Sequence, residues 1–154
     1  MRGLKHRMSL RINSALITES IDNLKTAPTT EKVLLWLGRK SGDSYVVDEV
    51  FTPMQVADED YFRIPEEGMD DLMNKLRATR KIIVAQIHTH PKEAFHSFAD
   101  DKWAIIRHQG AYSLVLPYFC SITNSGNFLD TVATFVLDEF NSWGEVDNSN
   151  IVIE

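Results

Sequence analysis

The stretch Lys81-Ile-Ile-Val-Ala-Gln-Ile-His-Thr-His-Pro91 decides how this chain is organised. Its first part, Lys81–Ile87, is short, apolar and rich in β-branched residues, which predicts a buried strand. His88 and His90 follow at the end of that strand, and side chains two residues apart on a strand point to the same face. We therefore expect two imidazoles to lie side by side, where both can bind one metal ion.

Further polar side chains follow the histidines along the chain. Ser97 and Asp100 stand three residues apart, so they share a face of the helix that we predict for Phe98–Arg107. A carboxylate there can act as a third metal ligand and leave a fourth position for water. Asp101 is a rival third ligand. Hydrolysis also needs an acid/base group, which must come from another part of the chain.

Several strands are predicted before the histidines. Alternating residues suggest a first short strand within Ser9–Ile17, and Thr18–Lys25 is compatible with a helix. Glu31–Leu37 is almost wholly apolar after its glutamate, which predicts a second buried strand. A hairpin-like connection at Gly38–Ser44 leads from it to a third strand at Tyr45–Phe51.

A helix is predicted to open at Ile64-Pro-Glu-Glu67, where acidic residues occupy the first turn. Its helically spaced apolar stripe indicates core packing rather than a binding groove. The stripe residues are Met69, Leu72, Met73 and Leu76. Later strands are expected at Ser113–Leu116, Leu129–Val136 and Ile151–Ile153, the last as an edge strand. This order indicates an α+β domain with a mixed sheet.

Composition narrows the class of protein. The chain has 154 residues, enough for one core, which we assign to 9–154 after a flexible N-terminus at 1–8. Its 44% hydrophobic and 25% charged residues are typical of a globular domain without a membrane span. The net charge of −6 disfavours nucleic-acid binding. Cys120 is the single cysteine, which is compatible with a cytoplasmic location, and we expect it to be a buried apolar residue.

The pattern of these residues resembles the JAMM (JAB/MPN-type) metalloprotease family. That family is marked by a distant glutamate, then H-x-H-P, then S-x-x-D. The matching residues are Glu31, His88-Thr-His-Pro91 and Ser97-Phe-Ala-Asp100. Glu31 also heads a segment that ends at Gly38, similar to the E-x-x-x-x-x-x-G strand of the family. Ser113–Pro117 looks like the strand that follows the motif helix in bacterial stand-alone members.

The resemblance implies a curved mixed sheet flanked by helices, the MPN/JAB (cytidine-deaminase-like) architecture. It also implies a zinc peptidase or isopeptidase that cuts after the C-terminal glycine of a ubiquitin-like or sulfur-carrier-type protein. In this reading His88, His90 and Asp100 bind zinc, Glu31 is the general base and acid, and Ser97 stabilises the oxyanion. Small bacterial members of the family are associated with ubiquitin-like conjugation systems, whose other proteins are candidate partners.

The match departs from the family at one place. Six residues separate His90 from Ser97, where well-known eukaryotic members have seven. Asp100 keeps the S-x-x-D spacing, so we prefer it to Asp101 as the third ligand. His96 and Phe95 lie in the same loop. Phe95 is a candidate for flanking the scissile peptide, and we assign no ligand role to His96.

Other interpretations compete with the enzyme. Ser97-x-x-Asp100 is also a helix-capping pattern that needs no metal, and Glu19 offers a poorer alignment than Glu31. A non-catalytic MPN scaffold that binds a ubiquitin-like partner is the main alternative function. A peptidase acting on a small peptide or carrier adduct, or a nucleic-acid-processing relative, are further alternatives. Two imidazoles and a carboxylate also accept iron or cobalt.

Overall fold

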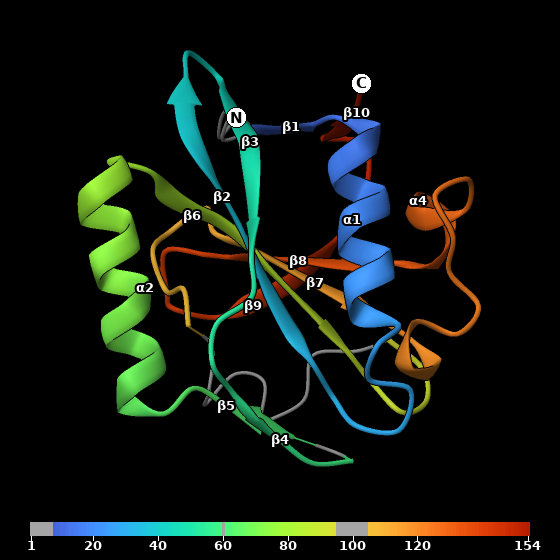
Figure 1. Ribbon diagram of the computed structural model, residues 1–154. Helices are drawn as coiled ribbons and strands as arrows, with labels where there is room; N and C mark the ends of the chain where they lie inside the picture. Colours follow the sequence, from blue (N-terminus) through green and yellow to red (C-terminus); the bar gives the residue numbers. More distant parts are fainter. Residues whose placement is uncertain (1–7, 60, 95–104) are drawn as a thin grey trace.

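An eight-stranded mixed sheet runs through the molecule (Figure 1). The computed structural model describes residues 8–59, 61–94 and 105–154. The strand order is β10-β1-β3-β2-β6-β7-β8-β9, and β4 and β5 form a separate two-stranded hairpin. The strands are β1 Ser9–Ile12, β2 Val33–Ser41, β3 Ser44–Phe51, β4 Val56–Ala57, β5 Phe62–Arg63, β6 Ile82–Thr89, β7 Tyr112–Leu116, β8 Ala133–Leu137, β9 Trp143–Val146 and β10 Ile151–Ile153. The helices are α1 Ser14–Leu24, α2 Glu66–Thr79, the 3-10 turn η1 Tyr118–Cys120 and α4 Phe128–Thr131.

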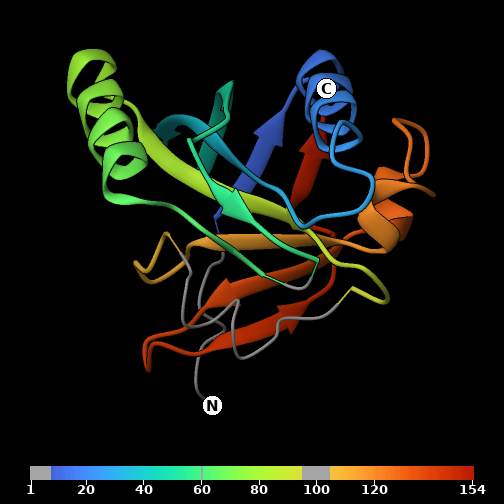
Figure 2. The same ribbon diagram turned by 60° about the horizontal axis from the view of Figure 1, so that its bottom comes forward.

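The sheet combines parallel and antiparallel pairs. β1 is parallel to both β3 and β10, β6 is parallel to β7, and the remaining neighbours are antiparallel. The predicted α+β class with a mixed sheet is therefore confirmed. The predicted edge strand at Ile151–Ile153 is confirmed as well, because β10 lies at one end of the strand order. β8 and β9 extend the other end, as the red strands at the bottom of Figure 2 show.

The two long helices cover opposite faces of β2. Leu34 and Trp36 belong to the large core beneath α1, whereas Leu35 and Leu37 pack with Leu72 of α2. This alternation follows from the two-residue period of a strand, and it explains why the segment is apolar throughout. Figure 1 shows α1 and α2 on either side of β2 and β3. The buried strand predicted at Glu31–Leu37 is confirmed, although its regular part begins at Val33.

The apolar stripe of α2 packs largely as predicted. Leu72 is fully buried, and Met69 and Leu76 pack around it against the sheet. Met73 is the exception, with 37% of its surface exposed.

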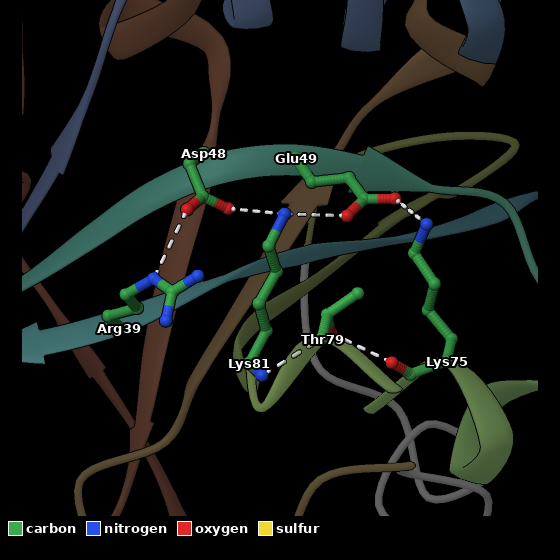
Figure 3. Close-up of polar contacts among 6 residues, drawn as sticks. All are labelled: Arg39, Asp48, Glu49, Lys75, Thr79 and Lys81. Atoms are coloured by element: carbon green, nitrogen blue, oxygen red, sulfur yellow. Dashed lines mark hydrogen bonds and ion pairs between the residues drawn. The ribbon is translucent and has the colours of Figure 1, made fainter. Parts of the chain in front are cut away.

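Charged side chains also tie α2 to the sheet (Figure 3). Lys75 of α2 and Lys81 just before β6 both contact Glu49 of β3, at 2.6 and 2.8 Å. Lys81 also lies 3.0 Å from Asp48, which pairs in turn with Arg39 of β2. We call these five residues the ion cluster.

Several predicted boundaries are wrong. The connection predicted at Gly38–Ser44 is shorter, because β2 continues to Ser41 and β3 begins at Ser44. The first strand ends at Ile12 rather than Ile17, because the Asn13 side chain accepts the amide hydrogen of Leu16 and begins α1. The strand predicted at Leu129–Val136 begins only at Ala133, because Phe128–Thr131 forms a helical turn. The buried residues Phe128 and Val132 are four apart, a spacing that suits a helix as well as a strand.

The end of the helix predicted at Phe98–Arg107 is also wrong. Residues 105–107 are not helical, and the rest of that range lies outside the described residues.

Met8 packs against the core although we placed it in the N-terminal segment. Its backbone oxygen accepts a hydrogen bond from the Tyr112 hydroxyl at 2.7 Å. Ordered packing therefore includes one residue more than the predicted domain, and residues 1–7 lie outside the described part. Among the helices of the described residues, none combines the length and the apolar character needed to cross a membrane.

Candidate metal centre

The neighbouring strands β2 and β6 bring the candidate base and the two histidines together. Val33 pairs with His88 in antiparallel register. One step further, the Thr89 amide donates to the Lys32 carbonyl at 3.1 Å and the Lys32 amide donates to Thr89 Oγ1 at 3.0 Å. Continued for two residues beyond the pair of Val33 and His88, this register sets Glu31 opposite His90. The segment Glu31–Leu37 therefore lies beside Lys81–Ile87, as a joint role of Glu31 and the two histidines requires.

Directly opposed residues of a sheet share a face, so Glu31 and His90 project to the same side. His88, two residues before His90, projects there as well. This is the face that α2 covers further along β2. His88 is fully buried, and Glu31 and His90 are each 2% exposed. The site is thus a cluster of buried ionisable side chains at the ends of two core strands, where burial strengthens every electrostatic interaction.

The two imidazoles are close enough to serve one ion. Their ring centroids lie 5.2 Å apart with the planes inclined at 54°. Imidazoles bound to a tetrahedral zinc with bonds of about 2.0–2.1 Å have centroids roughly 5 Å apart, so the distance between the two rings matches that geometry. Phe62 of β5 packs on His88 with a centroid distance of 5.3 Å, which restricts the His88 ring from the side of the hairpin.

Backbone hydrogen bonds hold His90 in place. Its amide donates to the Leu116 carbonyl at 2.9 Å, and its carbonyl accepts from the Phe119 amide at 2.7 Å. The second bond requires a sharp turn after β7, in which Tyr118, Phe119 and Cys120 all have positive φ angles of 53°, 52° and 67°. Non-glycine residues rarely adopt this conformation, and such strain is concentrated at functional sites.

Glu31 is held from the opposite edge of its strand. Its amide donates to the carbonyl of Asp58, in the turn of the β4–β5 hairpin, at 2.8 Å. A cavity of about 280 Å³ lies beside it, lined by residues from the 26–32 and 52–57 segments, Glu31 among them. Neither His88 nor His90 lines this cavity.

Other predicted site residues lie outside the described part of the chain. They are Ser97, Asp100, the rival Asp101, and the loop residues Phe95 and His96. Among residues 8–59, 61–94 and 105–154, no three His, Cys, Asp or Glu side chains are grouped to hold a metal. Two of the three predicted ligands are thus brought together, and the assignment of the third stays a prediction.

Three residues near the site had no role in the sequence interpretation. Phe62 packs on His88, Gln55 binds the backbone of Val33, and Gln86 accepts the amide hydrogen of Ile105 at 3.0 Å. Gln86 was visible as a polar residue within an apolar strand. Phe62 and Gln55 carry no local signal, because their partners are distant in the sequence.

Cys120 is fully buried, as predicted. Burial raises the pKa of its thiol to about 11, and the positive charge of Lys25 and a hydrogen bond from Thr123 lower it only in part. The thiol is therefore protonated at neutral pH, which makes it a poor nucleophile.

Comparisons with known proteins point to one family. No family model matches the chain. Probable metalloprotease y4jG of Sinorhizobium fredii (strain NBRC 101917 / NGR234) is 32% identical over 123 residues, which cover 77% of this chain and 74% of that protein. A JAB1/MPN domain protein of Archaeoglobus fulgidus, AF2198, shares the fold with a TM-score of 0.55 and 14% identity, over 96% of this chain and 98% of its own. The chain belongs to the JAMM (JAB1/MPN) metalloprotease family.

A second solved structure shares the fold of this chain. Protein DSY2949 of Desulfitobacterium hafniense aligns with a TM-score of 0.71 and 16% identity, over 94% of this chain and 92% of its own. Both structural alignments span nearly the whole chain. The architecture of this JAMM domain is thus the expected MPN/JAB sheet.

Proposed function

We propose that this JAMM domain is a zinc-dependent peptidase or isopeptidase that hydrolyses the bond after the C-terminal glycine of a ubiquitin-like or sulfur-carrier-type protein. The observation that carries the proposal is the placement of Glu31 opposite His90, on a buried face that it shares with the paired His88. A proton-transferring carboxylate next to two imidazoles is the arrangement that metal-assisted hydrolysis requires.

In this proposal His88, His90 and Asp100 hold the zinc ion. When bound, zinc polarises the scissile carbonyl and lowers the pKa of water towards 7. The strand geometry presents the two imidazoles together, and Asp100 follows from the S-x-x-D motif. The same donor set also accepts iron or cobalt, so the identity of the metal is part of the test.

Glu31 acts as general base and then as general acid. Its carboxylate takes a proton from the attacking water and returns it to the leaving amine. Ser97 donates a hydrogen bond to the developing oxyanion, an interaction worth about 2.7–4 kcal/mol in a preorganised site. Burial of Glu31 keeps bulk water from competing for that proton.

The substrate class rests on the family. Ubiquitin-like conjugates suit a site that lies at the ends of two strands and is flanked by the 52–59 segment, where an extended C-terminal tail can lie. Proteins of a ubiquitin-like conjugation system are the corresponding partners. The relative from Sinorhizobium fredii is named a metalloprotease, which supports hydrolysis rather than binding alone.

The test measures bound metal and cleavage of a glycine-linked ubiquitin-like fusion. We expect the wild-type protein to hold stoichiometric zinc and to cut after the glycine. Glu31→Gln should keep the metal and lower kcat by about 10²–10⁴-fold, the usual contribution of a general base. His90→Ala should lose both metal and activity. Glu19→Gln, an exposed glutamate on α1, is the matched control and should behave as wild type.

Two results would contradict the proposal. If Glu31→Gln cleaves at the wild-type rate, Glu31 is not the base. If the wild type holds no metal, or binds the fusion without cutting it, the domain is a scaffold of the MPN type.

A further inference from the structure

Strand β2 extends further towards Glu31 than its neighbour β3 does. The last pair between β2 and β3 is Leu35 with Phe51, and Pro53 follows on the β3 side. Beyond Leu35, β2 continues to Val33 without a neighbouring strand on the β3 side, and Glu31 precedes Val33 by two residues. Backbone groups at such an edge must find other partners, because an unsatisfied buried group is costly.

The side chain of Gln55 replaces the missing strand at Val33. Its Oε1 accepts the Val33 amide hydrogen at 2.8 Å, and its Nε2 donates to the Val33 carbonyl at 3.0 Å. Nε2 also donates to the carbonyl of Pro53 at 3.0 Å, which fixes the amide to its own loop. One side-chain amide thus makes the two bonds that a residue of a neighbouring strand would make.

The next backbone group on this edge belongs to Glu31. Amide hydrogens alternate between the two edges of a strand, so those of Val33 and Glu31 face the same way and that of Lys32 faces β6. The structure shows this alternation: Val33 binds Gln55, Lys32 binds Thr89, and Glu31 binds the Asp58 carbonyl at 2.8 Å. Gln55 and Asp58 thus supply the hydrogen bonds that a longer β3 would make to Val33 and Glu31.

We propose that Gln55 is a positioning residue that keeps Glu31 in register with His90 through its two-sided bond to Val33. The inference rests on the proposed function in one respect, namely that Glu31 transfers the proton. Small displacements of a catalytic group have large effects, since a misplacement of 1 Å can reduce the rate about 100-fold.

The chemistry of the bridge explains why glutamine is needed. Among side chains of this length, only the amide carries a donor and an acceptor together. Methionine fills a similar volume but makes neither bond. Glutamate at neutral pH accepts the Val33 amide hydrogen but sets a charged oxygen against two carbonyl oxygens.

The kinetic test uses Gln55→Met and Gln55→Glu in the full chain. We expect both to lower kcat for the glycine-linked fusion by about 10- to 100-fold, while KM, metal content and the folded state are kept. Gln109→Met is the matched control, because Gln109 is exposed in a turn remote from Val33 in the sequence. If either Gln55→Met or Gln55→Glu keeps the wild-type kcat, the two-sided bridge does not position the base.

A second measurement does not depend on activity. Hydrogen exchange of the metal-free protein should show faster exchange of the Val33 and Glu31 amides in Gln55→Met, with the core of β6 unchanged. If both amides keep wild-type protection, the inference is wrong whatever the enzyme does. If protection falls and kcat falls in Gln55→Met but Glu31→Gln is fully active, the bridge exists and the proposed role of Glu31 fails, which overturns the positioning role.

Discussion

At the scale of single residues, Ser20 of α1 shows how one small polar side chain joins a helix to the sheet. Its hydroxyl accepts the indole N–H of Trp36 at 2.9 Å and donates to the Leu16 carbonyl at 2.8 Å. Both Ser20 and Trp36 are fully buried. The bond therefore satisfies the single polar atom of the largest side chain in the core, which sits on the strand that leads back to Glu31.

Replacement of Ser20 by alanine leaves the Trp36 N–H buried without its acceptor. A buried donor without an acceptor lowers the stability by about 1–3 kcal/mol, and the higher helix propensity of alanine offsets roughly 0.5 kcal/mol of this loss. We expect the free energy of unfolding to fall by about 1–2 kcal/mol in urea denaturation. Ser41→Ala, at the exposed end of β2, is the control. An unchanged urea midpoint for Ser20→Ala would show that this bond adds no net stability.

At the scale of elements, Gly38 determines how closely β2 and β3 approach. The register between these strands shifts between Leu37 and Gly38. A Cβ atom at Gly38 would lie 1.9 Å from the Val46 carbonyl oxygen, far inside van der Waals contact. The glycine that ends the family's E-x-x-x-x-x-x-G strand thus has a physical reason, which is close contact between two backbones at a bulge.

Gly38→Ala should force β2 and β3 apart. Overpacking in a core costs about 1–3 kcal/mol. Because this clash is with backbone rather than with a flexible side chain, we expect the free energy of unfolding to fall by at least about 1 kcal/mol. Urea denaturation measures it. Gly144→Ala in β9 is the matched control, because a Cβ there meets no atom within 4 Å. Equal midpoints for the two variants would contradict the close-contact explanation.

At the scale of the whole molecule, the ion cluster joins α2 to the three central strands at the end remote from the histidines (Figure 3). Burial of Glu49 raises the pKa of its carboxyl, but hydrogen bonds from Lys75 and Lys81 outweigh burial and lower it below 4.5. The hydrogen bonds that Lys81 donates to Glu49 and Asp48 raise the pKa of Lys81 in turn. Both shifts favour the charged pair in the folded state.

The cluster predicts a pH dependence of stability. Because the pKa of Glu49 is lowered on folding, its contribution is fully present above pH 4.5 and is lost as the pH falls through the folded value. Glu49→Gln should reduce the free energy of unfolding by about 1–2 kcal/mol at pH 7, the range for hydrogen bonds to charged groups at a partly exposed site. The difference from wild type should shrink below pH 4.5.

Chemical denaturation between pH 3 and pH 8 measures this difference. The exposed Glu19, on α1 outside the cluster, provides the control as Glu19→Gln. A difference between wild type and Glu49→Gln that stays constant down to pH 3 would exclude the linkage.

The sequence by itself determined the local features of this protein. Strand periods and the motif spacing predicted the mixed sheet, the strand that ends in His88 and His90, and the buried strand headed by Glu31. These signals are readable because each depends on residues close together in the chain, or on a pattern shared with a known family. The helical turn at Phe128–Thr131 escaped because its apolar spacing suits both periods.

Only the tertiary structure decided what completes the site around those residues. The register of β2 against β6 sets Glu31 opposite His90, the hairpin brings Phe62 onto His88, and Gln55 replaces a strand at Val33. None of these contacts has a local signature, because each joins segments that are distant in sequence and is selected by the packing of the whole sheet. The candidate site residues could therefore be identified from the sequence, whereas their relative positions depend on non-local strand pairing and burial.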